Sequence, residues 1–249
     1  MSPEQPAEPV AETTRTARPH HKLTEDGRRM REVLSYSRRG ARFTPRQQEA
    51  WDAYAERWWV PDESVDDAGF SLVERFGREA PLIVEIGPGI GEATVALAAS
   101  RPDHNVLAVE VWRPGVADIL GRVGEAGLTN VRAIGIDAVW TMQNLVEPDS
   151  LAALWTFFPD PWHKTRHRKR RLVTPAFATL AASRLAVGSQ WRLATDWADY
   201  ADQMIEVLDA EPALLGGVVE RWDERPVTRF ERKGLAVERA ITDLAYRRV

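Results

Sequence analysis

Residues 82–99 have the sequence LIVEIGPGIGEATVALAA, in which an apolar run leads into a glycine-rich turn and then into alanine-rich helical sequence. Short apolar runs and helical stretches keep alternating to about residue 208. This alternation predicts an α/β protein with a doubly wound, mostly parallel sheet. Strands are expected at 82–86, 105–110, 131–136, 151–158 and 190–195, helices at 93–99, 176–185 and 197–208, and late antiparallel strands near 217–219 and 240–246.

The turn itself indicates what this sheet binds. A glycine-rich strand-to-helix turn lets the backbone approach a ligand and aims helix N–H groups at it. Its glycines, Gly87, Gly89 and Gly91, are spaced as G-x-G-x-G and not as the G-x-G-x-x-G of the dinucleotide fingerprint. Glu85, just before the turn, favours a ligand with positive charge, such as S-adenosylmethionine with its sulfonium and ammonium groups. The alternative is a tight turn in a sugar or nucleotide enzyme of another kind.

Two further acidic residues stand where strands of this sheet should end. Glu110 follows Gly87 by 23 residues, where doubly wound folds place a carboxylate that accepts hydrogen bonds from the hydroxyls of an adenosine ribose. Asp137 ends the next strand and is placed to meet the amino group of adenine. The alternatives are a solvated rim residue for Glu110 and a helix N-cap for Asp137. With Glu85, three acids at successive strand ends favour S-adenosylmethionine as the cofactor.

The fourth expected strand ends in Phe-Phe-Pro-Asp-Pro-Trp at residues 157–162, and a basic run follows. Two prolines flank Asp160, restrict its backbone and would fix its carboxylate, at the end of the sheet where ligands bind. Trp162 offers a flat face to a base, and six of the eight residues from Lys164 to Arg171 are Lys or Arg. The alternatives are a buried aromatic residue and a solvated helix start, but the position after the Asp160 loop favours phosphate contacts. These are predicted for Arg166, Arg168, Lys169, Arg170 and Arg171.

The charge of the chain is segregated. The 249 residues include 33 Lys and Arg against 37 Asp and Glu, a net charge of −4. Residues 160–185 hold seven basic side chains and one acidic side chain, whereas residues 61–159 hold six and 15. One basic block beside an acidic body predicts that a polyanion is held at one place.

Composition excludes several classes of protein. The chain has no cysteine, which excludes a disulfide scaffold, a thiolate metal site, an iron–sulfur cluster and a cysteine nucleophile. Five scattered histidines argue against a zinc site, so no metal is expected. The longest apolar stretches, such as 151–158, reach about half of the ~18 residues that a membrane-spanning helix needs. No membrane contact is expected, and the cytoplasm is the expected location.

Three other segments add to this pattern. Thr44, Pro45 and Gln47 form a predicted capping box before a helix that carries Trp51 and Tyr54. Asp196, after the fifth strand, caps the next helix or accepts hydrogen bonds from the N–H groups of guanine. Residues 225–231, with the sequence RPVTRFE, read as a connection between terminal strands.

Taken together, these motifs resemble the bacterial tRNA (guanine-N7-)-methyltransferase family. The resemblance runs from about residue 35 to the end of the chain, and its most specific parts are FPDPW at 158–162 with the basic run, ATDW at 194–197 and TRFE at 228–231. Pro88, His163 and residues 235–240 depart from the family pattern, which bears on loop geometry and tRNA preference. The sequence leaves open whether the protein is a monomer or a dimer and which tRNA species it prefers.

The resemblance implies a Rossmann-type enzyme that moves a methyl group from S-adenosylmethionine to N7 of guanine in the variable loop of tRNA (position 46). It implies a methyltransferase domain at 61–249, preceded by an N-terminal helical segment at 23–60 that contributes to RNA binding. Residues 1–22 lie outside the resemblance, and their four prolines and small apolar content predict a disordered tail. The implied residues around the donor are Glu85, Gly87, Gly89, Glu110, Asp137 and Asp160, with Asp160 also catalytic. The implied residues toward the substrate are Lys164, Asp196, Thr228, Arg229, Phe230 and Glu231.

Three alternative functions are disfavoured by particular features of the sequence. A nucleotide-dependent oxidoreductase is disfavoured by the G-x-G-x-G spacing. An RNA-binding protein without catalysis is disfavoured by the acidic set around the donor site. A small-molecule methyltransferase is disfavoured by the basic run at residues 164–171.

Overall fold

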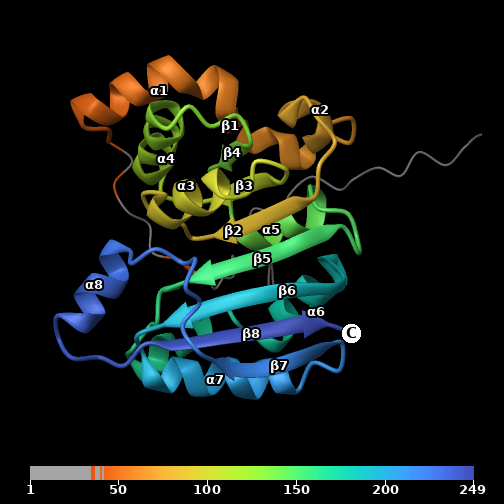
Figure 1. Cartoon of the computed structure of the whole chain (residues 1–249), viewed down its shortest axis with the longest axis vertical. Coiled ribbons are helices and arrows are strands. Elements are labelled where there is room, and N and C mark those ends of the chain that lie inside the picture. Colours follow the sequence, from red (N-terminus) through yellow and green to blue (C-terminus); the bar gives the residue numbers. More distant parts are fainter. Residues whose placement is uncertain (1–34, 37–39, 41) are drawn as a thin grey trace, which may run out of the picture.

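The computed structural model describes residues 35–36, 40 and 42–249 (Figure 1). The predicted tail at 1–22 and much of the segment at 23–41 lie outside these residues. In the described part of the chain, one sheet has the strand order β1-β4-β3-β2-β5-β6-β8-β7. Its strands are β1 (Trp59–Val60), β2 (Leu82–Ile86), β3 (Asn105–Val109), β4 (Val131–Ile134), β5 (Leu151–Phe157), β6 (Leu185–Thr195), β7 (Leu214–Val219) and β8 (Thr242–Arg248).

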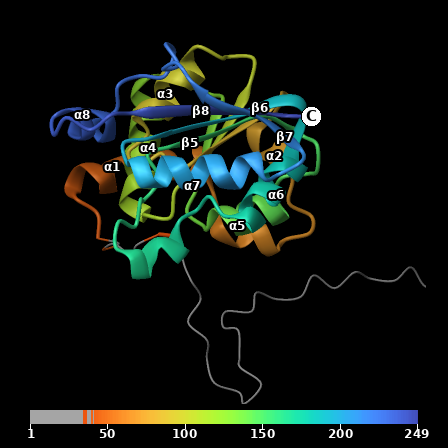
Figure 2. The same ribbon diagram turned by 90° about the horizontal axis from the view of Figure 1, so that it is seen from below.

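Helices cover both faces of this sheet. They are α1 (Pro45–Trp58), α2 (Leu72–Phe76), α3 (Glu92–Ala99), α4 (Arg113–Glu125), α5 (Ala138–Asn144), α6 (Pro175–Arg184), α7 (Ala198–Asp209) and α8 (Arg229–Leu235), with the 3₁₀ turns η1 (Asp62–Asp66) and η2 (Thr165–Arg170). One core joins the sheet to α1, α3 and α4, and the other joins it to α5, α6 and α7. Figure 2 shows α3 on one side of the sheet and α5, α6 and α7 on the other. The predicted doubly wound α/β fold is confirmed.

The order of the strands creates the position for a site. Strands β1 to β6 pair in parallel, and β8 pairs antiparallel with β6 and β7. The chain runs outward from β2 through β3 to β4 and then returns to β5, on the other side of β2. Ligands of such sheets bind beyond the carboxyl ends of the strands at this reversal. In Figure 1 the arrowheads of β2, β5 and β6 point to the side where α8 lies.

Most of the predicted elements are observed, with shifted ends. Strand β6 begins five residues earlier than expected, at Leu185. Of the two late strands, β7 is longer than expected and β8 is shifted by two residues, and both are antiparallel as predicted. The capping box before α1 is confirmed, since the Thr44 hydroxyl accepts from the Gln47 N–H and the Gln47 side chain accepts from the Thr44 N–H. Three α-helices were not expected. They are α2, α4, which contains Pro114 in its first turn, and α8, where a connection was predicted.

Candidate active site

The glycine-rich turn lies at the carboxyl end of β2, beside the reversal of strand order. Gly87, Gly89 and Gly91 have φ angles of 71°, 65° and 80°, in the left-handed region that glycine adopts without strain. A Cβ atom at Gly87 would meet no heavy atom within 4 Å. The predicted turn therefore offers open backbone to a ligand.

Glu110 holds this turn in place from the end of β3. One carboxylate oxygen accepts a hydrogen bond from the Gly89 N–H at 2.8 Å, and the other accepts one from the Trp112 N–H at 2.9 Å. The residue is buried. Glu110 thus belongs to the site through the turn that it fixes, and its contact with a ribose stays a prediction.

Glu85 is the buried acid of the site. The residue is 1% exposed and accepts a hydrogen bond from the Thr94 hydroxyl at 2.6 Å. Burial and the nearby charge of Glu110 raise the pKa of Glu85 to about 7, although the Thr94 hydrogen bond acts in the opposite direction. A cation that enters beside this carboxyl group would favour its ionised form.

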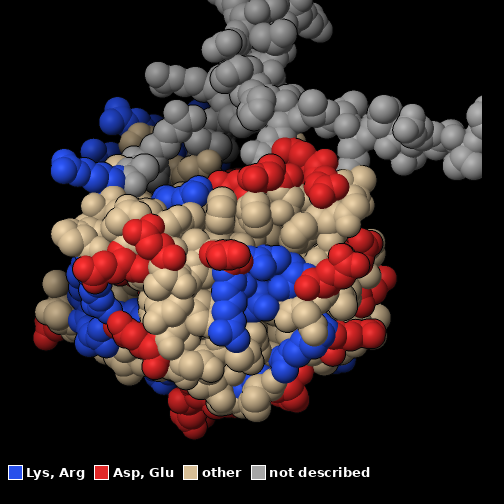
Figure 3. Space-filling model, turned by 90° about the horizontal axis from the view of Figure 1, so that it is seen from above, with Lys and Arg blue, Asp and Glu red and all other residues tan. Residues whose placement is uncertain are grey.

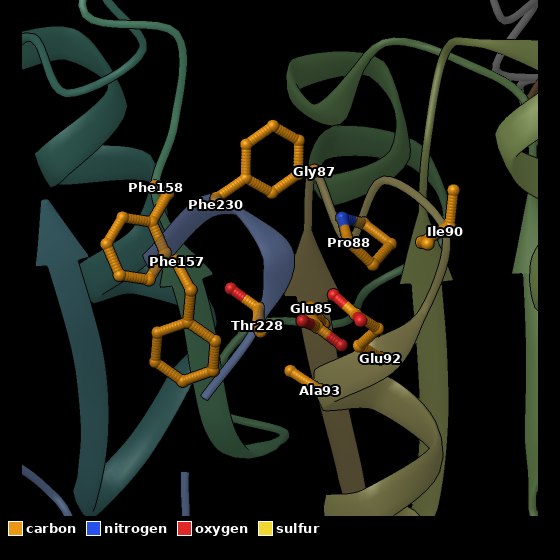
Figure 4. A pocket seen from close by; sticks show the side chains of 10 residues that line it. All are labelled: Glu85, Gly87, Pro88, Ile90, Glu92, Ala93, Phe157, Phe158, Thr228 and Phe230. Carbon is orange, nitrogen blue, oxygen red and sulfur yellow. The ribbon is translucent and has the colours of Figure 1, made fainter. Parts of the chain in front are cut away.

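A pocket lies between the glycine-rich turn and the end of β5 (Figure 4). Its lining residues are Glu85, Gly87, Pro88, Ile90, Glu92, Ala93, Phe157, Phe158, Thr228 and Phe230. In Figure 4, Phe157 and Phe158 line one side, Glu85 and Glu92 the other, and Phe230 lies near the turn. A Cβ atom at Gly89 would lie 3.1 Å from the Phe230 ring. Aromatic walls with acidic groups opposite suit a ligand that has both a flat part and a cationic part.

The loop that carries Asp160 follows β5 and leaves the pocket at Phe158. Phe158 and Trp162 have φ angles of 55° and 45°, which are uncommon for residues other than glycine and cluster at functional sites. The Phe158 N–H donates to the Ala194 carbonyl at 2.7 Å and ties the start of the loop to β6. Asp160 is half-buried, two residues beyond the pocket wall.

Trp162 contacts the chain that precedes α1. Its indole N–H donates to the Ser35 carbonyl at 3.0 Å. The Arg170 guanidinium lies 3.6 Å from the centre of the indole ring and donates to the Tyr36 carbonyl. One face of Trp162 is therefore covered by arginine, and the predicted stacking with a base would use the other face or displace Arg170.

The basic run after the loop divides into exposed and buried members. Lys164, Arg166, Arg168 and Lys169 are exposed. Arg171 is 2% exposed, and its guanidinium bonds to groups inside the protein. The predicted phosphate contact of Arg171 is thus corrected, because a run of like charges does not reveal which member turns inward.

Asp137 and Asp196 follow different alternatives of the sequence analysis. Asp137 caps α5 by accepting a hydrogen bond from the Val139 N–H at 2.9 Å, so the N-cap interpretation is confirmed and contact with adenine stays a prediction. Asp196 does not cap α7 with its side chain. It instead accepts a hydrogen bond from Arg239 at 2.7 Å, beside the segment that follows α8.

The TRFE segment starts a helix where a plain connection was expected. Thr228 caps α8, and both Thr228 and Phe230 line the pocket. Glu231 lies in an internal ion-pair network, with Arg221 at 2.9 Å and Arg225 at 2.6 Å. Burial alone would raise the pKa of Glu231, but the two arginines outweigh it and hold that pKa below its usual range. Glu231 is thus buried in ion pairs inside the protein, and the substrate contact that the resemblance implied stays a prediction.

Sequence reasoning missed two residues that shape this pocket. Glu92 accepts hydrogen bonds from the Arg229 N–H at 2.6 Å and from Arg232 at 2.8 Å, and so ties α8 to the first turn of α3. Arg225 has a fully buried side chain that pairs with Glu231 and with Asp243 of β8 at 2.9 Å. The position of Glu92 directly after the glycine turn was a usable signal, whereas nothing in the local sequence marks Arg225 as buried.

The described residues show a face of mixed charge (Figure 3) and no cluster of metal ligands. On the face in Figure 3, basic and acidic side chains are interspersed. Within residues 35–36, 40 and 42–249, no group of three or more His, Asp or Glu side chains could hold a metal ion. The helices of this part of the chain are too short or too polar to cross a membrane.

A pocket at the reversal point of a doubly wound sheet, with open glycine backbone and a buried acid, is typical of a Rossmann-type S-adenosylmethionine-dependent methyltransferase. A family described as "Putative methyltransferase" matches residues 79–244. The chain belongs to the tRNA (guanine-N(7)-)-methyltransferase family. It is 78% identical over 234 residues to the protein of that name from Nocardioides sp., with 94% of each chain covered. It is 46% identical over 232 residues to the one from Cutibacterium acnes, with 88% of this chain and 84% of the relative covered.

Solved structures share the fold at low sequence identity. An antibiotic related methyltransferase matches with a TM-score of 0.53 and 15% identity over 75% of this chain and 98% of its own. The 16S rRNA methyltransferase KamB matches with a TM-score of 0.53 and 15% identity over 71% of this chain and 92% of its own. These similarities support the methyltransferase fold.

Proposed function

We propose that this protein transfers the methyl group of S-adenosylmethionine to N7 of a guanine in tRNA, at position 46 in the variable loop. The observation that carries the proposal is the pocket between the glycine-rich turn and the Asp160 loop, with exposed basic residues directly beyond that loop. Two relatives that match over most of this chain are named for the same base and the same class of RNA.

The residues of the pocket fit the methyl donor. Glu85 is a buried carboxyl group with a raised pKa, and a cationic ligand would compensate the cost of its charge. Gly87 leaves open space beside the backbone, where a bulkier residue would project into a ligand. We assign Glu85, Gly87 and Gly89 to the donor, with Glu110 holding the turn. Bound here, the donor supplies an electrophilic methyl group.

The chemistry at the acceptor requires little from the protein beyond positioning. Guanine N7 carries a lone pair and no proton, so no general base is needed, and orientation and charge stabilisation supply the catalysis. Asp160, on the loop beyond Phe158, is proposed to orient the base and to offset the positive charge that the purine acquires. Asp196 would accept hydrogen bonds from the N–H edge of guanine in place of Arg239, which it now pairs with at 2.7 Å.

The proposed RNA contacts lie on both sides of the Asp160 loop. Lys164, Arg166, Arg168 and Lys169 are exposed and can neutralise phosphates. The segment 23–60 is proposed to contribute, since Ser35 and Tyr36 contact Trp162 and Arg170. Guanine N7 is inaccessible in a regular A-form helix, so the target base must lie in irregular RNA or be turned outward. With tRNA as substrate, the cytoplasm is the proposed location.

The test is methylation of a defined tRNA. The protein is incubated with unmodified tRNA transcript and donor labelled in the methyl group, and nucleosides are then separated. We expect label in 7-methylguanosine, and loss of label when guanine 46 of the transcript is replaced by adenine. Label in another nucleoside, or its persistence in the substituted transcript, would refute the assigned base or position. Binding of tRNA without any transfer would favour the non-catalytic RNA-binding alternative.

A further inference from the structure

Arg171 lies at the centre of a buried network behind the Asp160 loop. Its Nε donates to the Pro161 carbonyl at 2.8 Å. Its Nη1 donates to the Gln203 side chain at 2.8 Å, and its Nη2 donates to the Asp199 carboxylate at 2.7 Å. The side chain is 1% exposed. The guanidinium therefore joins the loop directly to α7, which carries both Asp199 and Gln203.

The Asp160 loop needs support from outside itself. Phe158 and Trp162, at its two ends, both adopt left-handed backbone conformations, which persist only where the surroundings hold them. Pro159 and Pro161 have no N–H to donate. The carbonyl of Pro161, next to Asp160, is thus a point at which the loop can be fixed, and Arg171 donates to it.

The same network continues to the surface that faces RNA. The Asp199 oxygen that accepts from Arg171 also accepts from Arg168 at 2.8 Å, and the Arg168 side chain is 46% exposed. The Arg171 guanidinium lies 4.7 Å from the centre of the Tyr200 ring, and the Tyr200 hydroxyl accepts from the Val173 N–H at 3.1 Å. The N–H edge of the guanidinium therefore donates to groups inside the protein, and its flat face packs against Tyr200.

We propose that Arg171 is a positioning residue for methyl transfer: it fixes the Pro161 carbonyl to α7 and thereby holds Asp160 at the pocket. The proposal rests on the proposed function and replaces the phosphate contact expected from the sequence. The planar fork of arginine is required, because lysine cannot donate in three directions from one plane. If Asp160 loses its position, the rate of methyl transfer in the bound complex should fall, whereas RNA binding should change little because it depends on exposed charges.

The principal test compares Arg171→Lys with Arg166→Gln, a change in an exposed member of the same run. For Arg171→Lys we expect kcat to fall roughly 10- to 100-fold, while KM for tRNA and the salt dependence of tRNA binding stay at wild-type values. For Arg166→Gln we expect a higher KM for tRNA and a salt slope lower by about one. A wild-type kcat in Arg171→Lys, or a reduced salt slope in that variant, overturns the proposal.

A second variant and a second measurement keep the test independent of folding and of activity. Gln203→Ala removes one hydrogen-bond acceptor of Arg171 and should lower kcat less than Arg171→Lys does. If Arg171→Lys does not fold, a wild-type kcat in Gln203→Ala overturns the proposal. Hydrogen exchange of residues 158–163 should be faster in the folded variants than in the wild type, and unchanged exchange also overturns it. If the wild type itself does not methylate tRNA, the proposed function fails, and exchange still decides the role of Arg171.

Discussion

Ionisation of Glu85 should control how strongly the protein binds its methyl donor. In the free protein, burial and the charge of Glu110 raise the pKa of Glu85 to about 7. The ammonium and sulfonium groups of S-adenosylmethionine favour the ionised carboxylate, so binding releases the proton that Glu85 holds at lower pH. Affinity for the donor should therefore rise as the pH increases from 6 to 8.

The magnitude follows from the pKa. With a pKa of about 7, roughly nine tenths of Glu85 is protonated at pH 6 and roughly one tenth at pH 8. If the donor binds the ionised form, the dissociation constant at pH 6 should be about tenfold larger than at pH 8, or ~1.4 kcal/mol. Binding should release about 0.9 proton at pH 6 and about 0.1 at pH 8.

Calorimetry measures both quantities when the titration is repeated in buffers of different ionisation enthalpy. Glu85→Gln is the matched control, since it keeps the shape of the side chain and should bind the donor weakly, without this pH dependence. Thr94→Val removes the hydrogen bond that lowers the pKa of Glu85, so it should move the transition to higher pH. A dissociation constant that is the same at pH 6 and pH 8, with no proton release, would refute the assignment of Glu85 to the donor's positive charge.

Three other variants test separate parts of the site. Asp160→Ala should lower single-turnover methylation about 100-fold, or ~3 kcal/mol, with a much smaller change in donor affinity; a rate near that of the wild type would make Asp160 a loop-shaping residue. Changing both Arg166 and Lys169 to Gln should reduce the log–log salt slope of tRNA binding by about one to two units, and an unchanged slope would identify the run as a solvated surface. Gly91→Ala should destabilise the fold by about 2 kcal/mol, because φ is 80° and the new Cβ would lie 2.8 Å from Ile119. A melting temperature equal to that of the wild type would show that α4 shifts to accommodate the added methyl group.

The central strands could be predicted because the parallel sheet is covered on both faces. In β3, for example, all five residues are buried, and the four after Asn105 form a continuous apolar run that ends at Glu110. Helix α4 escaped prediction, since its sequence contains Pro114 and Gly115, which usually mark a turn. Pro114 is tolerated there because it lies in the first turn, where its missing N–H has no helical partner.

The site was predictable at residues fixed by strand ends and less so elsewhere. Glu85 and the glycine turn follow a strand directly, so their place depends on local sequence. Arg171 was assigned to RNA and Glu231 to the substrate, yet both are buried in ion pairs. The partner of Arg171 is 28 residues away in the chain, and the two partners of Glu231 are 10 and 6 residues away. Whether a charge in a polar segment faces water or a buried partner depends on tertiary packing, which local sequence does not encode.

The antiparallel end of the sheet has a consequence for how the chain folds during synthesis. Among the described strands, β7 pairs with β8 alone, although β7 is made first. Strand β7 can therefore join the sheet only after β8 has emerged from the ribosome, because β8 links it to β6, where Gln190 lies opposite Arg247. Helix α8, which supplies Phe230 to the pocket, lies between β7 and β8 in the chain. Phe230 comes last in the chain among the residues that line the pocket, so the pocket is completed only after residue 230 has been translated. Pairing between strands far apart in the chain is also slow to form.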